Sequence, residues 1–155
     1  FLVEAKELPA DTAAKMITFY FVGMAIGRFL SGLLTVRFSS WQIIGVSLGT
    51  ILIAILFLLY PYGYITAVVG LFLIGLGNGP IFPNMTYLTP KLFGEEVSQS
   101  VIGIQMAFSY LSIMLSPVFF GVLAQNIGIC CFVPFLGVMF VMMAGMIIYV
   151  KCIKS

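Results

Sequence analysis

The sequence predicts an all-α membrane protein, and two observations carry this prediction. Of the 155 residues, 62% are hydrophobic and only 8% are charged, whereas a soluble domain carries roughly 25% charged residues. The charges are also segregated, because no Asp, Glu, Lys or Arg occurs from Phe38 to Pro90 or from Val97 to Val150. A helical crossing of a membrane needs about 20 residues, so each of these runs has room for two crossings and a turn.

Five spanning helices follow in order along the chain. The first lies between Lys15 and Arg37 and contains one internal charge, Arg28. The segment "YPYGY" (60–64) divides the first uncharged run, and "QNIG" (125–128) divides the second, since proline and glycine mark turns. The sequence therefore predicts helices over residues 13–36, 41–60, 64–90, 97–124 and 129–150. No segment alternates at period two as a membrane barrel requires, which leaves a helical bundle.

The first twelve residues differ from the rest of the chain. They read as the last turn of an earlier helix followed by a loop on the outside, and they lack the basic region and apolar core of a signal peptide. We therefore expect residues 1–12 to be an outside loop that follows a missing helix. Residues 13–155 are expected to form a partial C-terminal bundle.

The positions of lysine and arginine predict the orientation. Four of the predicted loop and tail cations fall on one side of the membrane: Arg37, Lys91, Lys151 and Lys154. Because cytoplasmic loops are enriched in Lys and Arg, this side is expected to be cytoplasmic. The C-terminus is then inside the cell and the protein is a multi-pass protein of the cell membrane.

Several kinds of chemistry are absent from the sequence. There is no His, and the predicted membrane segments contain no carboxylate. Cys130, Cys131 and Cys152 have neither metal-ligand spacing nor the pattern of a disulfide framework. We therefore expect no catalytic residue, no metal site, no cofactor and no nucleic-acid partner, and we expect that the protein is not an enzyme.

Polar residues concentrate on three of the five predicted helices. The helices at 13–36, 64–90 and 97–124 carry amides, hydroxyls and Arg28, whereas those at 41–60 and 129–150 are apolar nearly all round. Polar side chains in membrane helices tend to face a bundle interior or a watery cavity. This distribution predicts an internal polar path lined by the first group, with the two apolar helices as lipid-facing supports.

The segment "GNGPIFPNMTY" (77–87) raises a separate question, because its prolines lie inside a predicted helix. Pro80 and Pro83 remove the backbone hydrogen bonds that would reach the carbonyls of Leu76 and Gly79. One interpretation is an interrupted helix that lines the path, as in many transporter binding sites. The alternative is a kinked but continuous helix whose asparagines bond to neighbouring helices.

Small residues also recur four apart, as the pairs Gly23/Gly27, Gly45/Gly49 and Gly75/Gly79. This spacing permits close packing of membrane helices. We expect close packing in particular for Gly45/Gly49, because its helix has almost no other polar group.

Three longer segments carry a resemblance to a known family: "GMAIGRFLSGLLTVRF" (23–38), "GLGNGPIFPNMTYLTPKLFG" (75–94) and "SQSVIGIQMAFSYLSIMLSPVFFGVLAQ" (98–125). Together they resemble the second half of a major facilitator superfamily transporter, from the loop before its eighth helix to the end of its twelfth. They look most like the sugar-porter relatives grouped with fucose permease.

The resemblance implies a secondary transporter in which two six-helix halves rock about a central site. The partners implied are a small-molecule substrate, with a sugar favoured, the lipid bilayer and the N-terminal half of the same protein. The substrate-binding candidates are the polar side chains on the lining helices: Tyr20, Arg28, Asn78, Asn84, Gln105 and Tyr110. A channel or a non-transporting assembly subunit remains the alternative function.

Overall fold

The computed structural model describes residues 10–59, 63–128 and 132–154. Within these ranges the chain forms α1 (Ala10–Leu34), α2 (Ser40–Leu59), α3 (Gly63–Phe93), α4 (Glu95–Ile127) and α5 (Phe132–Lys154). All five are long and apolar enough to cross a membrane. The predicted fold class and number of spans are confirmed.

The helix bounds differ from the predicted ones at several ends. The helix α1 begins at Ala10, inside the segment predicted to be a loop, and α3, α4 and α5 all continue past their predicted last residues. The predicted beginning of the last helix, including Cys130 and Cys131, lies outside the described residues. Cys152 is exposed on α5 and is a free thiol.

Local capping explains where two of the helices begin or end. The Ser39 N–H donates to Gln42 Oε1 at 3.0 Å, and the Gln42 N–H donates to Ser39 Oγ at 3.4 Å. This reciprocal pair is a capping box, and it begins α2. At the end of α3, the Gly94 N–H donates to the Pro90 carbonyl at 2.9 Å. Gly94 has a φ of 86°, a conformation that glycine adopts without steric cost, so α4 can begin immediately afterwards.

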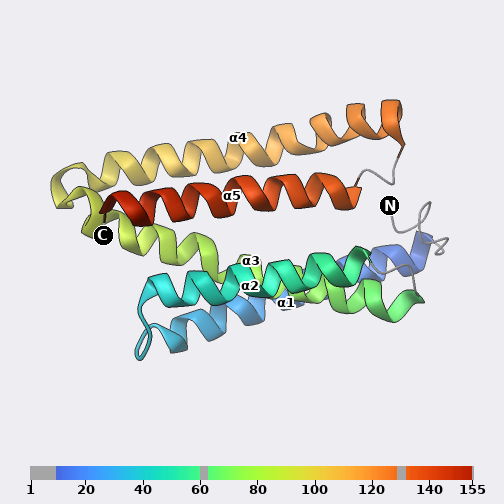
Figure 1. Cartoon of the computed structure of the whole chain (residues 1–155), viewed down its shortest axis with the longest axis horizontal. Helices are drawn as coiled ribbons and strands as arrows, with labels where there is room; N and C mark the ends of the chain where they lie inside the picture. The colour runs from blue at the N-terminus through green and yellow to red at the C-terminus, as the bar shows by residue number, and fades with distance from the viewer. Residues whose placement is uncertain (1–9, 60–62, 129–131, 155) are drawn as a thin grey trace.

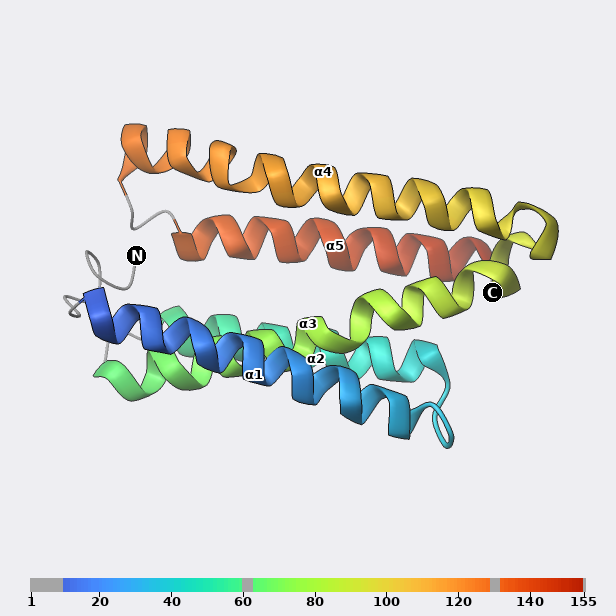
Figure 2. The ribbon, with the colours of Figure 1, turned by 180° about the vertical axis from the view of Figure 1, so that it is seen from behind.

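The helices lie in two layers (Figure 1). One layer contains α1, α2 and the first part of α3, and the other contains α4 and α5 side by side. Figure 2 shows that α3 bends and that its last part runs across to the beginning of α4. The α1–α2 turn, the α3–α4 turn and the end of α5 lie at the same end of the bundle in both views. Arg37, Lys91 and Lys151 therefore share one side, as the sequence predicted.

The buried core sits mainly between α2 and α3. On α2 it includes Ile44, Ile51 and Ala54, whose exposed fractions are 5% or less. The core continues onto α3 through Ile74 and other side chains, and α5 contributes two residues to it. The opposite face of α2 remains exposed and apolar. The predicted support helix α2 therefore packs one face on α3 and presents the other outward.

The helices α1 and α3 touch through glycine. A Cβ atom added at Gly23 or Gly27 would overlap the backbone carbonyl of Phe72 or Leu76 on α3. Added at Gly79, it would lie 2.6 Å from the Met24 carbonyl oxygen. The two backbones therefore pack directly on each other, as the small-residue spacing allows.

The expectation of close packing at Gly45/Gly49 is wrong. Gly45 and Gly49 are exposed on α2, and an added Cβ at either position meets nothing within 4 Å. Only the other face of α2, which carries Ser47, Ile51 and Ala54, packs inward. The small-residue spacing shows that close approach is possible at a position but not that a neighbouring helix is present.

The predicted interruption of the helix at 77–87 is also wrong, and the alternative of a continuous, bent helix is correct. α3 includes Pro80, Pro83 and Pro90 without a break. Prolines are the commonest cause of helix kinks, and they account for the bend in Figure 2. The Leu76 carbonyl, which loses its partner at Pro80, lies against Gly27, where a Cα–H group can contact it. Packing by a neighbouring helix thus lets α3 continue.

Candidate functional site

The polar side chains of α1 and α3 surround a pocket of about 340 Å³, here called the α1–α3 pocket. It lies at the end of the apolar span of α1, with Thr35 and Val36 in the turn that follows, and within the apolar span of α3. The residues that line it are Arg28, Ser31, Gly32, Thr35, Val36, Pro83, Asn84 and Tyr87. Its volume is at the lower end of the range for small-molecule sites.

Asn84 is the most buried polar side chain of this pocket, with 2% of its surface exposed. Its Nδ2 donates to Ser31 Oγ at 2.6 Å and to the Pro80 carbonyl at 2.8 Å. The first bond joins α3 to α1, and the second is made within α3 beside the proline segment. Asn84 Oδ1 has no hydrogen-bond partner among the described residues. The Nδ2 group of the amide is thus fixed by two hydrogen bonds, while Oδ1 accepts none from the described residues.

Arg28 belongs to the same pocket and is exposed, although it lies inside the apolar span of α1. Arginine has donors but no acceptor. Within the described part of the chain its guanidinium forms no ion pair or hydrogen bond. The pocket therefore contains a charged group that is free to contact a ligand.

Tyr87 closes the pocket on the α3 side and connects it to a second cation. The Lys91 Nζ atom lies 4.5 Å from the centroid of the Tyr87 ring, a distance at which a cation is attracted to the ring face. Lys91 is one turn after Tyr87 on the same helix, so it adds positive charge near the pocket.

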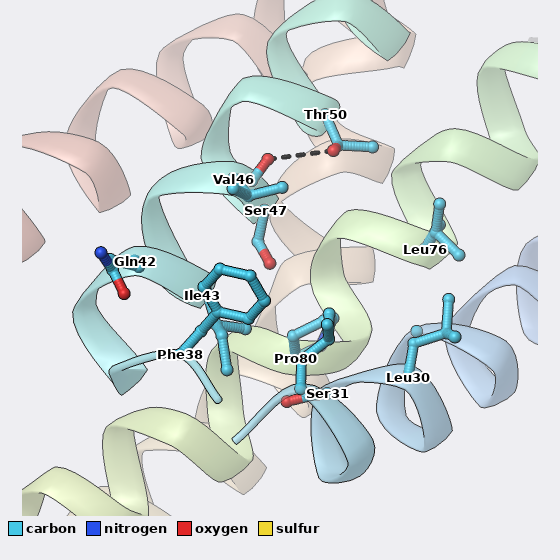
Figure 3. Close-up of a pocket in the computed structure, with 12 residues that line it drawn as sticks. Leu30, Ser31, Phe38, Gln42, Ile43, Val46, Ser47, Thr50, Leu76 and Pro80 are labelled. Atoms are coloured by element: carbon cyan, nitrogen blue, oxygen red, sulfur yellow. Dashed lines mark hydrogen bonds between the residues drawn. The ribbon is translucent and has the colours of Figure 1, made fainter. Parts of the chain in front are cut away.

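A second cavity of about 310 Å³ lies on the other side of the Ser31–Asn84 bond, among α1, α2 and α3. Figure 3 shows its lining, with Ser31 beside Pro80 and with Ile43 and Ser47 contributed by α2. Most of its other lining residues are apolar, and Thr50 donates its hydroxyl to the Val46 carbonyl at 2.9 Å. Ser31 lines both hollows, so they lie next to each other at this residue.

Gln105 lies away from the α1–α3 pocket, where α4 meets the end of α3. The Thr89 Oγ1 atom lies 3.2 Å from Gln105 Oε1 and 3.1 Å from the Met85 carbonyl oxygen, and its single hydrogen is shared between these two acceptors. Thr89 is 1% exposed. Among the described side chains, this pair forms the polar contact between the end of α3 and α4. Gln105 therefore takes part in helix packing and does not line the α1–α3 pocket.

Replacing Thr89 with Val tests this link. The substitution keeps the branched shape and removes the hydroxyl, so Gln105 loses its partner. We expect a loss of about 0.5–1.5 kcal/mol in stability, measured as a lower thermal unfolding midpoint of the purified full-length protein. Thr86→Val is the matched control, because the Thr86 hydroxyl bonds only to the Phe82 carbonyl of its own helix. Equal effects of the two substitutions would contradict a link between helices.

The remaining predicted site residues lie in other places. Tyr20 is partly buried against the core and contacts the Phe21 ring edge-on at 5.3 Å. Asn78 is half-buried and lines neither of the two pockets described here. Tyr110 is 70% exposed on α4. Of the six candidates, the structure brings together Arg28 and Asn84 alone.

Sequence reasoning placed Ser31 and Tyr87 on helices with a polar face but not among the binding candidates, and it missed Thr35 and Thr89. A signal for three of them was present, because positions three and seven residues apart share a helix face. Ser31 and Thr35 lie at these spacings from Arg28, and Tyr87 lies three residues after Asn84. The buried Thr89 had no such signal, since its partner is on another helix.

The groups that line the α1–α3 pocket are hydrogen-bonding groups and one cation. Across residues 10–59, 63–128 and 132–154, no group of three or more His, Cys, Asp or Glu side chains could hold a metal ion. The pocket offers a guanidinium, an amide and three hydroxyls. These groups can form hydrogen bonds and ion pairs.

Comparison with known proteins gives one match. A family model described as "Major Facilitator Superfamily" matches residues 2–153, nearly the whole chain. No curated protein and no solved structure matches the chain.

Proposed function

Because the chain belongs to the Major Facilitator Superfamily, we propose that it forms helices eight to twelve of the C-terminal half of a secondary transporter. The transporter carries a small polar solute, a sugar, across the cell membrane by symport. The N-terminal half of the same protein is the partner that completes the path. Transport proceeds by alternating access, as the two halves rock about a central site, and the solute is not changed chemically.

The α1–α3 pocket is the observation that carries the proposal. Polar side chains within membrane spans, such as Arg28, Ser31 and Asn84 here, are expensive unless they pair with each other or face water or a ligand. Here Asn84 holds Ser31 by a 2.6 Å hydrogen bond, and the hydroxyls of Thr35 and Tyr87 lie around the same pocket. Amides and hydroxyls can both donate and accept, which suits a solute rich in hydroxyl groups. The resemblance to relatives of fucose permease also favours a sugar.

The charge distribution supports one orientation. Arg37, Lys91 and Lys151 lie at one end of the bundle, and the cytoplasmic side of membrane proteins is enriched in such residues. In the proposed orientation the C-terminus and the Lys91 end of the α1–α3 pocket face the cytoplasm.

Uptake by the full-length protein tests the function. Proteoliposomes that contain it should take up at least one radiolabelled solute from a panel of monosaccharides and acidic monosaccharides with saturable kinetics, and empty liposomes should not. A secondary transporter accumulates the solute against its gradient when a coupling gradient is applied. Flux that never saturates and never exceeds equilibrium would instead indicate a channel, and no flux for any panel member would contradict the proposal.

The source of coupling can be predicted from the absence of acidic side chains in the spans. Proton-driven transporters use membrane-embedded Asp, Glu or His as relays. Glu95 and Glu96 are at the first turn of α4, outside the uncharged runs, and the sequence has no His. If uptake is driven by protons, the coupling carboxylate must lie in the part of the protein that precedes this chain, and we expect it on a cavity-lining helix of the first half. Replacing every upstream intramembrane Asp and Glu by Asn and Gln, one at a time, should then abolish the pH dependence of uptake in at least one variant. If the pH dependence of uptake persists in all of these variants, this assignment is refuted.

A further inference from the structure

The α1–α3 pocket contains positive charge that is not balanced by a described acidic side chain. Arg28 lines the pocket, and Lys91 is held over the ring of Tyr87, which lines it as well. The acidic side chains that the structure describes are Glu95 and Glu96, and neither pairs with Arg28 or Lys91. A neutral sugar would leave both charges without a counterion.

The geometry of Arg28 matches an anion with two oxygens. A guanidinium presents its donors in a planar fork that binds carboxylate and phosphate through two parallel hydrogen bonds. Arg28 is exposed where it lines the pocket, so the strength of such a pair depends on how far the bound ligand excludes water. The nearby charge of Lys91 acts in the same direction, because it raises the electrostatic potential of the pocket.

The other pocket groups are placed to bind hydroxyls. Asn84 Nδ2 donates to Ser31 Oγ, so the hydroxyl hydrogen of Ser31 can be donated to a ligand. Thr35 Oγ1 donates to the Gly32 carbonyl at 2.7 Å, and its oxygen can still accept. The Tyr87 hydroxyl can do both. The pocket thus combines one anion-binding group with several hydroxyl-binding groups.

We infer that the transported solute is an acidic sugar, whose carboxylate or phosphate binds Arg28 and whose hydroxyl groups bind Ser31, Thr35 and Tyr87. This inference rests on the proposed transport function and specifies the substrate class of the same pocket. A pocket of about 340 Å³ is of a size for one monosaccharide-scale solute.

The test compares three probes of similar size on the purified full-length protein: glucuronate, glucose 6-phosphate and glucose. Binding is measured by the thermal shift that each probe produces. Transport is measured as uptake of one radiolabelled probe in competition with the other two unlabelled probes. At least one of the two anions should bind tenfold or more tightly than glucose. If glucuronate alone does so, the anionic group is a carboxylate, and if glucose 6-phosphate alone does so, it is a phosphate.

Substitution of Arg28 tests whether this side chain supplies the selectivity. Arg28→Gln should weaken binding of the preferred anion tenfold or more and should change glucose binding less than twofold. Arg28→Lys should keep part of the anion selectivity, because it retains the charge but loses the fork. Arg37→Gln is the matched control, since Arg37 lies in the exposed turn after α1 and does not line the pocket. It should change neither affinity.

Several results would overturn the inference without touching the transport function. One is saturable uptake of glucose with no preference for either anion by the unsubstituted protein. Another is an equal loss of anion and glucose binding in Arg28→Gln and Arg28→Lys, which would assign Arg28 to an acidic partner in the N-terminal half. The comparison of anions with glucose needs no variant, so it decides the question even if the Arg28 variants fail to fold. If no panel member is transported but an anion still binds selectively, the proposed function fails and the anion site remains.

Discussion

Gly75→Leu should abolish the accumulation of folded full-length protein, whereas Gly49→Leu should leave it nearly unchanged. A Cβ atom at Gly75 would overlap the Tyr20 carbonyl and lie 2.9 Å from the Met24 amide nitrogen. Both are backbone atoms of α1, which cannot move aside as a flexible side chain can. Overpacking a well-packed interior costs about 1–3 kcal/mol of stability and occasionally more. A leucine side chain between two backbones should destabilise the protein by at least the upper value of this range.

Fluorescence-detected size-exclusion chromatography of the tagged protein in detergent measures this effect. We expect the monodisperse peak of Gly75→Leu to fall below a tenth of that of the unsubstituted protein. The peak of Gly75→Ala should be higher than that of Gly75→Leu and lower than that of the unsubstituted protein. Gly49 is the matched control, because it is a helix glycine of the same small-residue pattern with nothing within 4 Å of an added Cβ. A normal peak for Gly75→Leu, or an equal loss for Gly49→Leu, would show that the α1–α3 contact is not close-packed in the protein.

Asn84→Leu should cause the second largest loss, this time in both transport and stability. The side chain is 2% exposed, and its Nδ2 makes the bond that ties α3 to Ser31. Leucine has a similar size but makes no hydrogen bond, so the pocket loses its buried amide. We expect initial uptake rates to fall at least tenfold and the thermal midpoint of the purified protein to drop. Asn78→Leu is the matched control on the same helix, because Asn78 is only half-buried and lies outside the pocket.

A double-mutant cycle separates the Ser31 bond from other effects of the substitution. Interhelical hydrogen bonds in membranes average about 0.6 kcal/mol and reach about 1.7 kcal/mol, so the coupling energy between Asn84→Leu and Ser31→Ala should fall in that range. A coupling energy of zero would show that the two side chains do not bond in the protein. Unchanged uptake by Asn84→Leu would remove Asn84 from the binding site.

The number of helices could be predicted because a membrane imposes strong constraints on sequence. Each uncharged run holds two spans, and the cations that interrupt the runs fall at one end of the bundle. These features depend on composition over about 20 residues. They do not depend on which neighbour each helix meets, so one sequence is enough to read them.

The course of α3 could not be predicted in the same way. Pro80 and Pro83 remove backbone hydrogen bonds in any environment, and the sequence alone cannot show whether another helix compensates. In the structure the Leu76 carbonyl lies against Gly27 of α1, and the Asn84 side chain donates to the Pro80 carbonyl. The first of these contacts joins residues more than forty positions apart in the chain, so the continuation of the helix depends on a neighbour that local sequence does not reveal.

The site was predicted only in part for a related reason. Polar residues identify a helix that has a polar face, but the direction of that face depends on how the helix is rotated in the bundle. Arg28 and Asn84 face the same pocket, whereas Gln105 bonds to Thr89 and Tyr110 is exposed on α4. The same limit explains the error at Gly45 and Gly49, whose spacing is right but whose face of α2 has no described neighbour.

The central position of α3 has a consequence for how the protein is made. Helices leave the ribosome in chain order and enter the bilayer before they pack together. α2 has the highest mean hydropathy of the five spans and can insert without help. α1 carries Arg28, which disfavours insertion, and its packing partner α3 is synthesised only after α2. During synthesis α1 must therefore remain near the translocon, incompletely packed, until the glycines of α3 arrive. The interval between α1 and α3 is the period in which quality-control proteases have the best access to this chain.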